Sequence, residues 1–296
     1  MCYVVYSLET ALQQHCPSCC LPYLDTRLDC SLLRGSDSAI FSPQFLGNSR
    51  GNVTTGVAAN WNPEPPDCDD SGNGYLTRSV DTGGCENGLL YTDNDVDRVL
   101  SMRSYDHLCW PYRRSDFEVT HGGPHLWIGG HMVALPCSPN DPMFFLHHCW
   151  VDKLVEMLKD RLPPTRWTYP RRARRPQRAR DRAAPFDWTC EEGLDDEELE
   201  KEYTYEISPA DDTCNTDAEC SPVGLLWCDT SAERGECKAK CREGGVCRAG
   251  EDASCYCANG TPRCDGGRCR CQAGEATTTA TSVPPASTTR PFIPLS

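Results

Sequence analysis

Cysteine is the residue that most limits what this chain can fold into. The sequence holds 22 cysteines, and eleven of them lie between Cys214 and Cys271. A reducing compartment would leave such a density as free thiols, so we expect an exported chain that is cross-linked by disulfides. Because eleven is odd, at least one cysteine of this segment is expected to stay free or to pair outside it.

These cysteines predict a separate small module over residues 211–272. Its spacing resembles that of an EGF-like domain, in which disulfides replace a core too small to hold itself together. The relevant run is Cys237-x3-Cys241-x5-Cys247-x7-Cys255-x-Cys257-x6-Cys264. The disulfide connectivity stays open, because spacing alone does not determine it. Residues 273–296 are rich in Ser, Thr and Pro, which predicts a disordered tail.

The charge balance excludes a general nucleic-acid binder. The chain has 43 acidic and 29 basic side chains and a formal net charge of −14, whereas phosphate binding needs clustered cations. No run approaches the roughly 18 uncharged apolar residues of a transmembrane helix. We therefore expect neither a nucleic-acid partner nor a membrane partner.

Two sequons agree with export and predict a secreted glycoprotein. Asn52 and Asn259 each begin an Asn-x-Thr sequence, the acceptor pattern for N-glycosylation. Residues 1–9 nevertheless lack the basic region, the apolar core and the cleavage site of a signal peptide. The composition of a secreted protein without a signal peptide predicts a chain that is missing its natural beginning.

Three segments carry helical signals, so residues 1–210 are predicted to be mainly α-helical. An apolar stripe runs from Val4 to about His15, and early acids suit a helix start over 93–100. Asp141 can cap a helix in which Pro142 takes the first position and which continues to Leu162. The intervening loops are expected to be long and pinned by disulfides, and the charged runs 163–182 and 191–202 to be solvated.

Histidine clustering is the main sign of chemistry. Five of the seven histidines lie within 28 residues of sequence: His121, His125, His131, His147 and His148. Spacing of four residues places the first two imidazoles on one helical face, where both can bind the same ion. The helix after Asp141 offers a third ligand, and three neutral imidazoles suit copper or zinc rather than magnesium or calcium.

Several alternatives remain open on the residues alone. Pro124 and its two preceding glycines make a regular helix through His121 doubtful. His131 follows two glycines and is better interpreted as an ordinary loop histidine than as a ligand. Helical periodicity favours His147 over His148 as the inward-facing residue of the pair.

A longer pattern resembles the copper-B half of the tyrosinase family. It comprises His121-Gly-Gly-Pro-His125 and then Ser138-Pro-Asn-Asp-Pro-Met-Phe-Phe-Leu-His-His148-Cys-Trp-Val-Asp152. This resemblance implies that the metal ligands are His121, His125 and His148. It makes His147 a neighbour that supports them, and Asp152 either a partner that orients an imidazole or a plain surface acid.

The resemblance extends over roughly residues 1–206, within a predicted copper-binding domain of residues 1–210. The similar segments are Leu21-Pro-Tyr-Leu-Asp25, Phe45-Leu-Gly47, Val53-Thr-Thr-Gly56, Asp95–Leu100 and Tyr203-Thr-Tyr205. It implies a copper-binding four-helix bundle with long loops, in which two copper ions together bind dioxygen and oxidise phenols or catechols to quinones. Gly122 stands where some hydroxylating members carry Asn, which favours catechol oxidation over monophenol hydroxylation.

The resemblance also implies an incomplete site. Met1 stands where the last copper-A ligand belongs, and neither His15 nor His107 falls at a copper-A position. We therefore expect at most one copper in this chain, no activity without the missing part, and poor stability of an opened bundle.

Two rival classes of function remain. The first is a mononuclear zinc or copper protein with a three-histidine site. The second is a noncatalytic secreted protein whose metal site is residual and whose cysteine-rich module binds an extracellular matrix partner. Metal analysis separates the first from a tyrosinase-like oxidase, and an assay of catechol oxidation separates the second.

Overall fold

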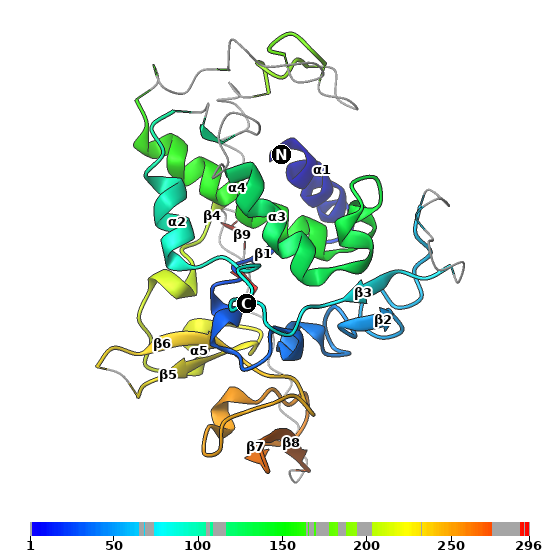
Figure 1. The fold of residues 1–296 in the computed structure, drawn as a ribbon, viewed down its shortest axis with the longest axis vertical. Coiled ribbons are helices and arrows are strands. Elements are labelled where there is room, and N and C mark those ends of the chain that lie inside the picture. The colour runs from blue at the N-terminus through cyan, green and yellow to red at the C-terminus, as the bar shows by residue number, and fades with distance from the viewer. Residues whose placement is uncertain are drawn as a thin grey trace.

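The structure is a computed structural model that describes most of the chain. The described residues are 2–64, 68, 74–104, 107–108, 117–163, 165, 169, 178–182, 188–193, 203–231, 233–273, 291–292 and 294–295. Figure 1 shows the longer helices together in one part of the molecule and the hairpins β5–β6 and β7–β8 in another. Much of the two charged runs lies outside the described residues.

Helix α4 is the central element of the helical part. The α-helices are α1 (Cys2–Gln13), α2 (Asp93–Leu100), α3 (Phe117–Ile128), α4 (Met143–Arg161) and the short α5 (Asp217–Cys220). Helix α4 contacts each of α1, α2 and α3, and it also packs against β1 (Figure 1). Short 3-10 helices connect these elements: η1 (Leu28–Ser31), η2 (Gly35–Asp37), η3 (Ala39–Phe41), η6 (Gly130–Val133), η7 (Ser138–Asn140), η10 (Pro209–Asp211) and η11 (Asp252–Ser254).

The predicted helix starts agree with the structure to within a residue or two. Helix α2 has the predicted bounds and begins with a capping box in which the Thr92 and Asp95 side chains accept each other's backbone N–H. Helix α4 begins at Met143, one residue later than predicted, so that Pro142 takes the capping position. The Asp141 carboxylate still caps the helix, because its Oδ1 accepts from the Met143 N–H at 3.0 Å.

The doubt about a helix through His121 and His125 was wrong. Helix α3 continues past Pro124, which lies buried within it. A side chain at Gly123 would come within 2.6 Å of the Leu89 carbonyl oxygen, so glycine is required for this close approach. Trp127 and Ile128 are completely buried at the end of the helix. Tertiary packing therefore outweighs the low helix propensity of Gly-Gly-Pro.

Strands are short and occur in pairs. They are β1 (Tyr23–Leu24), β2 (Arg50–Asn52), β3 (Thr77–Ser79), β4 (Thr204–Tyr205), β5 (Leu226–Asp229), β6 (Glu236–Ala239), β7 (Thr261–Asp265), β8 (Arg268–Gln272), β9 (Pro291–Phe292) and β10 (Pro294–Leu295). The β2–β3, β5–β6 and β7–β8 pairs are antiparallel. The β1–β10 and β4–β9 pairs are parallel. The described end of the chain thus pairs with the helical part, whereas residues 274–290, for which disorder is predicted, lie outside the described residues.

Disulfides dominate the segment 211–272. It contains the pairs Cys214–Cys228, Cys220–Cys237, Cys247–Cys264, Cys255–Cys269 and Cys257–Cys271. The odd cysteine expected from the count is Cys241, a buried free thiol. Among the described residues of the preceding part of the chain, three further pairs occur: Cys16–Cys19, Cys30–Cys85 and Cys68–Cys137.

The cysteine-rich module is docked on the helical part through residues 37–39. The Ala39 N–H donates to the Lys240 carbonyl at 2.8 Å, and the Arg242 N–H donates to the Asp37 carbonyl at 2.8 Å. The Asp37 carboxylate also accepts from the Val246 N–H at 3.0 Å. Backbone pairing across the junction fixes the module in place. None of the helices among the described residues is long and apolar enough to span a bilayer.

Candidate metal centre

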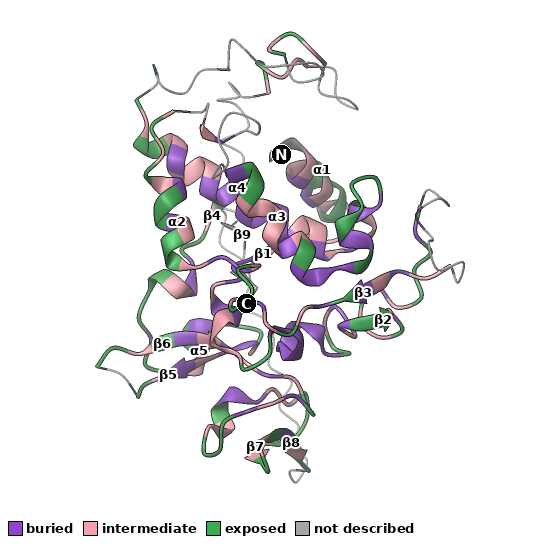
Figure 2. Cartoon of the chain, in the orientation of Figure 1, coloured by how far each residue is buried: buried purple, intermediate pink, exposed green. Residues whose placement is uncertain are grey.

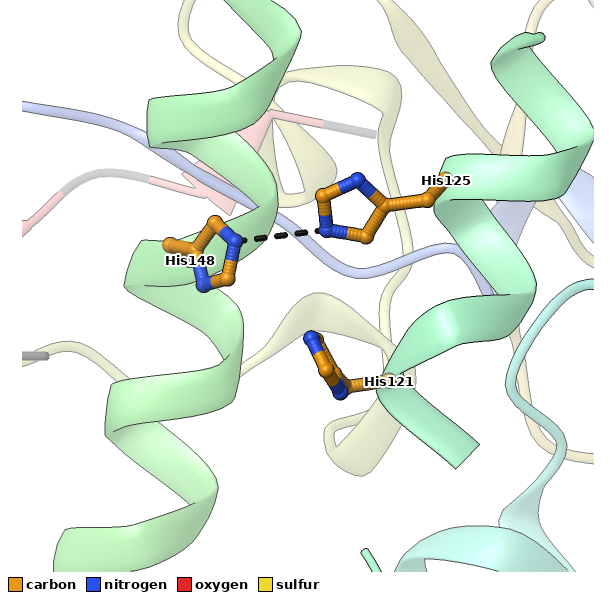
Figure 3. Close-up of side chains that lie close together, drawn as sticks. All are labelled: His121, His125 and His148. Carbon is orange, nitrogen blue, oxygen red and sulfur yellow. Dashed lines mark hydrogen bonds between the residues drawn. The ribbon is translucent and has the colours of Figure 1, made fainter. Parts of the chain in front are cut away.

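Three imidazoles converge between helices α3 and α4. Figure 3 shows His121 and His125 on one helix facing His148 on the other. One ligand atom from each residue lies within 4.8 Å of the other two, and the Nε2 atoms of His125 and His148 are 3.3 Å apart. Metal–nitrogen bonds of about 2.0–2.1 Å place neighbouring ligand nitrogens roughly 3.3–3.6 Å apart. This geometry therefore accommodates one ion with only a small movement of His121.

Backbone carbonyls set the orientation of the two rings on α3. His125 Nδ1 donates to the Met132 carbonyl at 2.9 Å and lies 3.1 Å from Ser138 Oγ. His121 Nδ1 donates to the Glu118 carbonyl. With the proton held on Nδ1, the lone pair of each ring is on Nε2, which faces the centre. Which carbonyls take this role was not predictable, because a backbone carbonyl leaves no trace in residue type.

Burial favours the uncharged form of His125 and His148. Desolvation, together with a smaller effect of the nearby imidazoles, lowers the pKa of His148 to about 2. The same causes lower the pKa of His125, although its hydrogen bond to the Met132 carbonyl opposes them. Neutral imidazole is the form that binds metal, so the environment prepares the ligands at neutral pH.

His147 lies beside the cluster and supports it. Its side chain is completely buried, and Nε2 donates to the His121 carbonyl at 2.8 Å. Its ring is parallel to that of His121, with the centroids 6.0 Å apart. The structure thus places His148, rather than His147, in the cluster. Periodicity favoured His147 as the inward-facing residue, and its side chain is indeed completely buried, but the ring that joins the cluster is that of His148.

Phe144 forms an apolar wall that sequence analysis did not single out. Its ring centroid lies 4.1 Å from that of His148 and 6.1 Å from that of His125. It precedes His148 by four residues, so both side chains project from the same face of α4. That spacing is the signal that could have identified it.

Asp152 is buried, so its interpretation as a surface acid was wrong. Only 3% of the residue is exposed, and its Oδ2 accepts from the Tyr203 hydroxyl at 3.0 Å and from the Tyr205 hydroxyl at 2.9 Å. Among the hydrogen bonds of the described residues, its partners are these tyrosines and not an imidazole. Asp152 therefore joins α4 to the segment around β4.

The other histidines lie outside the cluster. His131 is buried in η6, and its Nδ1 accepts from the Thr77 N–H at 3.0 Å, as expected for a structural histidine. His15 and His107 are not part of the group of potential ligands found among the described residues. The sequon residue Asn259 is exposed and Asn52 is half-buried.

Comparison with known proteins gives a consistent result. The family model for the common central domain of tyrosinase matches residues 3–161. A tyrosinase-like protein of Caenorhabditis elegans, tyr-3, is 28% identical over 98% of this chain and 41% of its own length. Tyrosinase of Streptomyces antibioticus is 36% identical over 49% of this chain and 56% of its own length.

A third relative and one solved structure add to these similarities. Tyrosinase-like protein 2 of Margaritifera margaritifera is 30% identical over 54% of this chain and 38% of its own length. A polyphenol oxidase variant from Thermothelomyces thermophila has 25% sequence identity and a TM-score of 0.43, covering 55% of this chain and 54% of the other. The chain spans about half the length of the curated relatives that it matches.

The extent of the family match settles the family. The matched range, residues 3–161, is more than half of the chain and includes every histidine of the cluster between α3 and α4. The predicted resemblance is thereby confirmed, and the chain belongs to the tyrosinase family of copper proteins.

Proposed function

We propose that His121, His125 and His148 hold one copper ion as the copper-B half of a tyrosinase-like oxidase. Its substrates would be phenols or catechols, which dioxygen oxidises to quinones. The observation that carries this proposal is the convergence of three ligand nitrogens within 4.8 Å. Copper would supply one-electron exchange with dioxygen, which no amino-acid side chain provides.

The residues around the cluster have assignable roles. The Met132 and Glu118 carbonyls hold the rings of His125 and His121 in the tautomer that binds metal. His147 fixes the separation of α3 and α4 through the His121 carbonyl. Phe144 excludes water from one side of His148.

The proposal gives this chain a single copper. Within the described residues, the cluster between α3 and α4 is the one histidine group with three potential ligands. A second copper would require ligands from outside these residues, so we propose that two-electron oxidation depends on a further copper-A segment. A side chain at Gly122 would meet no atom within 4 Å, so this position beside His121 is open to solvent or substrate. We propose catechols as the preferred substrates.

We propose that the protein is extracellular. Eight disulfides among the described residues suit an oxidising compartment. We propose N-glycosylation at Asn52 and Asn259. The proposed partners are a small phenolic substrate and dioxygen.

Copper stoichiometry tests the proposal directly. Purified protein is dialysed against copper or zinc, and the bound metal is measured by mass spectrometry. We expect one copper per chain, loss of that copper in His125→Gln and His148→Gln, and retention in the matched control His131→Gln. Failure to bind copper, or a preference for zinc under competition, would overturn the proposal.

An activity assay separates the oxidase from the noncatalytic alternative. Catechol oxidation is measured for the chain alone and for the chain joined to a copper-A segment of a tyrosinase. We expect activity only in the joined protein. Two bound coppers without oxidation would favour a noncatalytic extracellular protein in which the cysteine-rich module binds a matrix partner.

A further inference from the structure

A continuous row of aromatic rings leads away from the histidine cluster. His147 lies 6.4 Å from Tyr91, measured between ring centroids, and Tyr91 lies 6.3 Å from Trp150. Trp150 stacks on Tyr23 at 5.7 Å. The row therefore passes from the metal centre through the core formed by α2, α4 and β1.

The row continues to the far side of the helical part. Tyr23 lies 6.2 Å from Tyr205, and Tyr205 lies 5.6 Å from Tyr203. Tyr91, Trp150 and Tyr23 are buried, whereas Tyr203 and Tyr205 line an open cavity of about 830 Å³. We call Tyr91, Trp150, Tyr23, Tyr205 and Tyr203 the aromatic row. It connects a buried end beside the cluster with an end that solutes can reach.

The outer end of the row is equipped for proton transfer. A tyrosine that gives up an electron also releases its phenolic proton, so a nearby base is needed to stabilise the neutral radical. The Tyr203 and Tyr205 hydroxyls both donate to Asp152 Oδ2, at 3.0 and 2.9 Å. Tyr23 donates instead to the Glu206 carbonyl, which is not a base. Within the aromatic row, only Tyr203 and Tyr205 are hydrogen-bonded to a carboxylate.

Two cations lie against the middle of the row. The guanidinium carbon of Arg27 is 5.2 Å from the ring centroid of Trp150, and Lys153 Nζ is 5.7 Å from it. Positive charge beside an indole disfavours its radical cation. Only a strong oxidant would therefore oxidise Trp150. The radical would then end on Tyr203 or Tyr205.

We propose that the aromatic row carries oxidising equivalents out of the metal centre when no substrate is bound. With an oxidised metal held by the cluster, Tyr203 or Tyr205 would give up one electron, which would pass through Tyr23, Trp150 and Tyr91 to that metal as its one-electron acceptor. The phenolic proton passes to Asp152. A small solvent-borne reductant, a thiol or a catechol, then returns one electron and one proton to the tyrosyl radical and is itself oxidised by one electron. This inference rests on the proposed function, which supplies the oxidant.

A photochemical experiment tests the row without copper. A ruthenium polypyridyl complex is coordinated to the partly exposed His121 of the metal-free full chain, after His15→Gln and His107→Gln remove two other labelling sites. A light flash with an electron-accepting quencher generates an oxidant at the cluster. We expect a tyrosyl radical signal in electron paramagnetic resonance.

Four variants locate that radical. The signal should be lost in the double variant Tyr203→Phe/Tyr205→Phe and should fall in Asp152→Asn, which lacks the proton acceptor. It should also be lost in Trp150→Phe, which leaves every tyrosine in place. The matched control is Tyr256→Phe, because Tyr256 belongs to the cysteine-rich module, packs against Phe45 and is not part of the row. This control should leave the signal unchanged.

The experiment has clear outcomes against the proposal. An undiminished signal in Trp150→Phe or in the double phenylalanine variant would overturn it, and so would equal loss in Tyr256→Phe. Near-ultraviolet circular dichroism checks that each variant keeps its packing. Because the photo-oxidant replaces copper, failure of this test leaves the copper-binding proposal intact, and failure of copper binding leaves this test valid.

Discussion

The helical part and the cysteine-rich module are stabilised in opposite ways. Around α4, the buried residues are large aromatic and aliphatic side chains such as Trp150 and Leu154. In the second half of the module, the buried cluster consists of cysteines, of which Cys247, Cys255 and Cys269 are paired in disulfides. Figure 2 shows buried residues along α4, whereas β7 and β8 are mostly exposed or half-buried.

This difference shows where a chain of this kind can build a metal site. A core of large side chains fixes helices closely enough to aim three imidazoles at one point. A small module has too little apolar surface for that and depends on covalent bonds. All seven histidines precede the module in sequence. The predictions below test this division of roles.

The largest expected effect concerns a buried ion pair in the helical part. Arg78 and Asp141 have completely buried side chains, joined by contacts of 2.6 and 2.8 Å. Arg78→Met should lower the free energy of unfolding by about 3–5 kcal/mol, because Asp141 is left as a buried unpaired charge. Urea denaturation measures this. The double variant Arg78→Met/Asp141→Asn, which removes the charge but keeps an oxygen for the Met143 N–H, should recover part of the loss, and no recovery would contradict the explanation.

Loss of a disulfide should lower the stability of the cysteine-rich module. Cys255→Ala/Cys269→Ala opens a loop with a sequence separation of 14. A loop of this size predicts a loss of about 3 kcal/mol. Hydrogen exchange should increase around β7 and β8, whereas the copper affinity of the cluster should not change. A parallel loss of copper binding would show that the two parts are not independent.

A substitution of His147 tests whether its hydrogen bond supports the histidine cluster. His147→Phe keeps a ring but loses the hydrogen bond to the His121 carbonyl. Copper affinity should fall about 10- to 100-fold, the usual effect of removing a group that orients a ligand. Competition with a copper chelator measures this, with His131→Gln as the control. An affinity equal to that of the control would assign His147 a purely structural role.

The free energy of unfolding should depend on pH through Asp29, which lies in η1, an element that packs against β6 of the module. Burial, with a smaller contribution from the neighbouring Asp25 carboxylate, raises the pKa of Asp29 to about 7. The folded chain then binds more protons at this site than the unfolded chain between about pH 4 and 7, so stability falls as pH rises through that window, by up to about 1.4 kcal/mol per pH unit. In Asp29→Asn, the thermal unfolding midpoint should depend less on pH across this window. An unchanged profile would contradict the assignment.

Much of the helical part was predictable from residue patterns. The early acids of α2 and the capping carboxylate of Asp141 act through local geometry, which sequence encodes directly. Helix α3 was not predictable in this way. Its Gly-Gly-Pro sequence disfavours a helix locally, and only the close approach of Gly123 to Leu89 and the burial of Trp127 compensate for that.

The candidate site, like α3, was only partly predictable from local residue patterns. Its three histidines were implied by a family pattern, but periodicity by itself favoured His147, because it carries no information on the angle at which α3 meets α4. Asp152 could not be placed either, since its partners, Tyr203 and Tyr205, are more than fifty residues away in sequence. Hydrogen bonds between distant segments depend on packing that local patterns do not record.

The sequence by itself determined the cysteine-rich module, the odd cysteine in it, and the residue types that suit copper, because counts and spacings are properties of the chain. Tertiary structure decided which cysteine stays free, which imidazole of the His147–His148 pair joins the cluster, and which rings line up behind it. The physical reason is that side-chain packing selects among local alternatives of similar free energy, and that selection involves residues far apart along the chain.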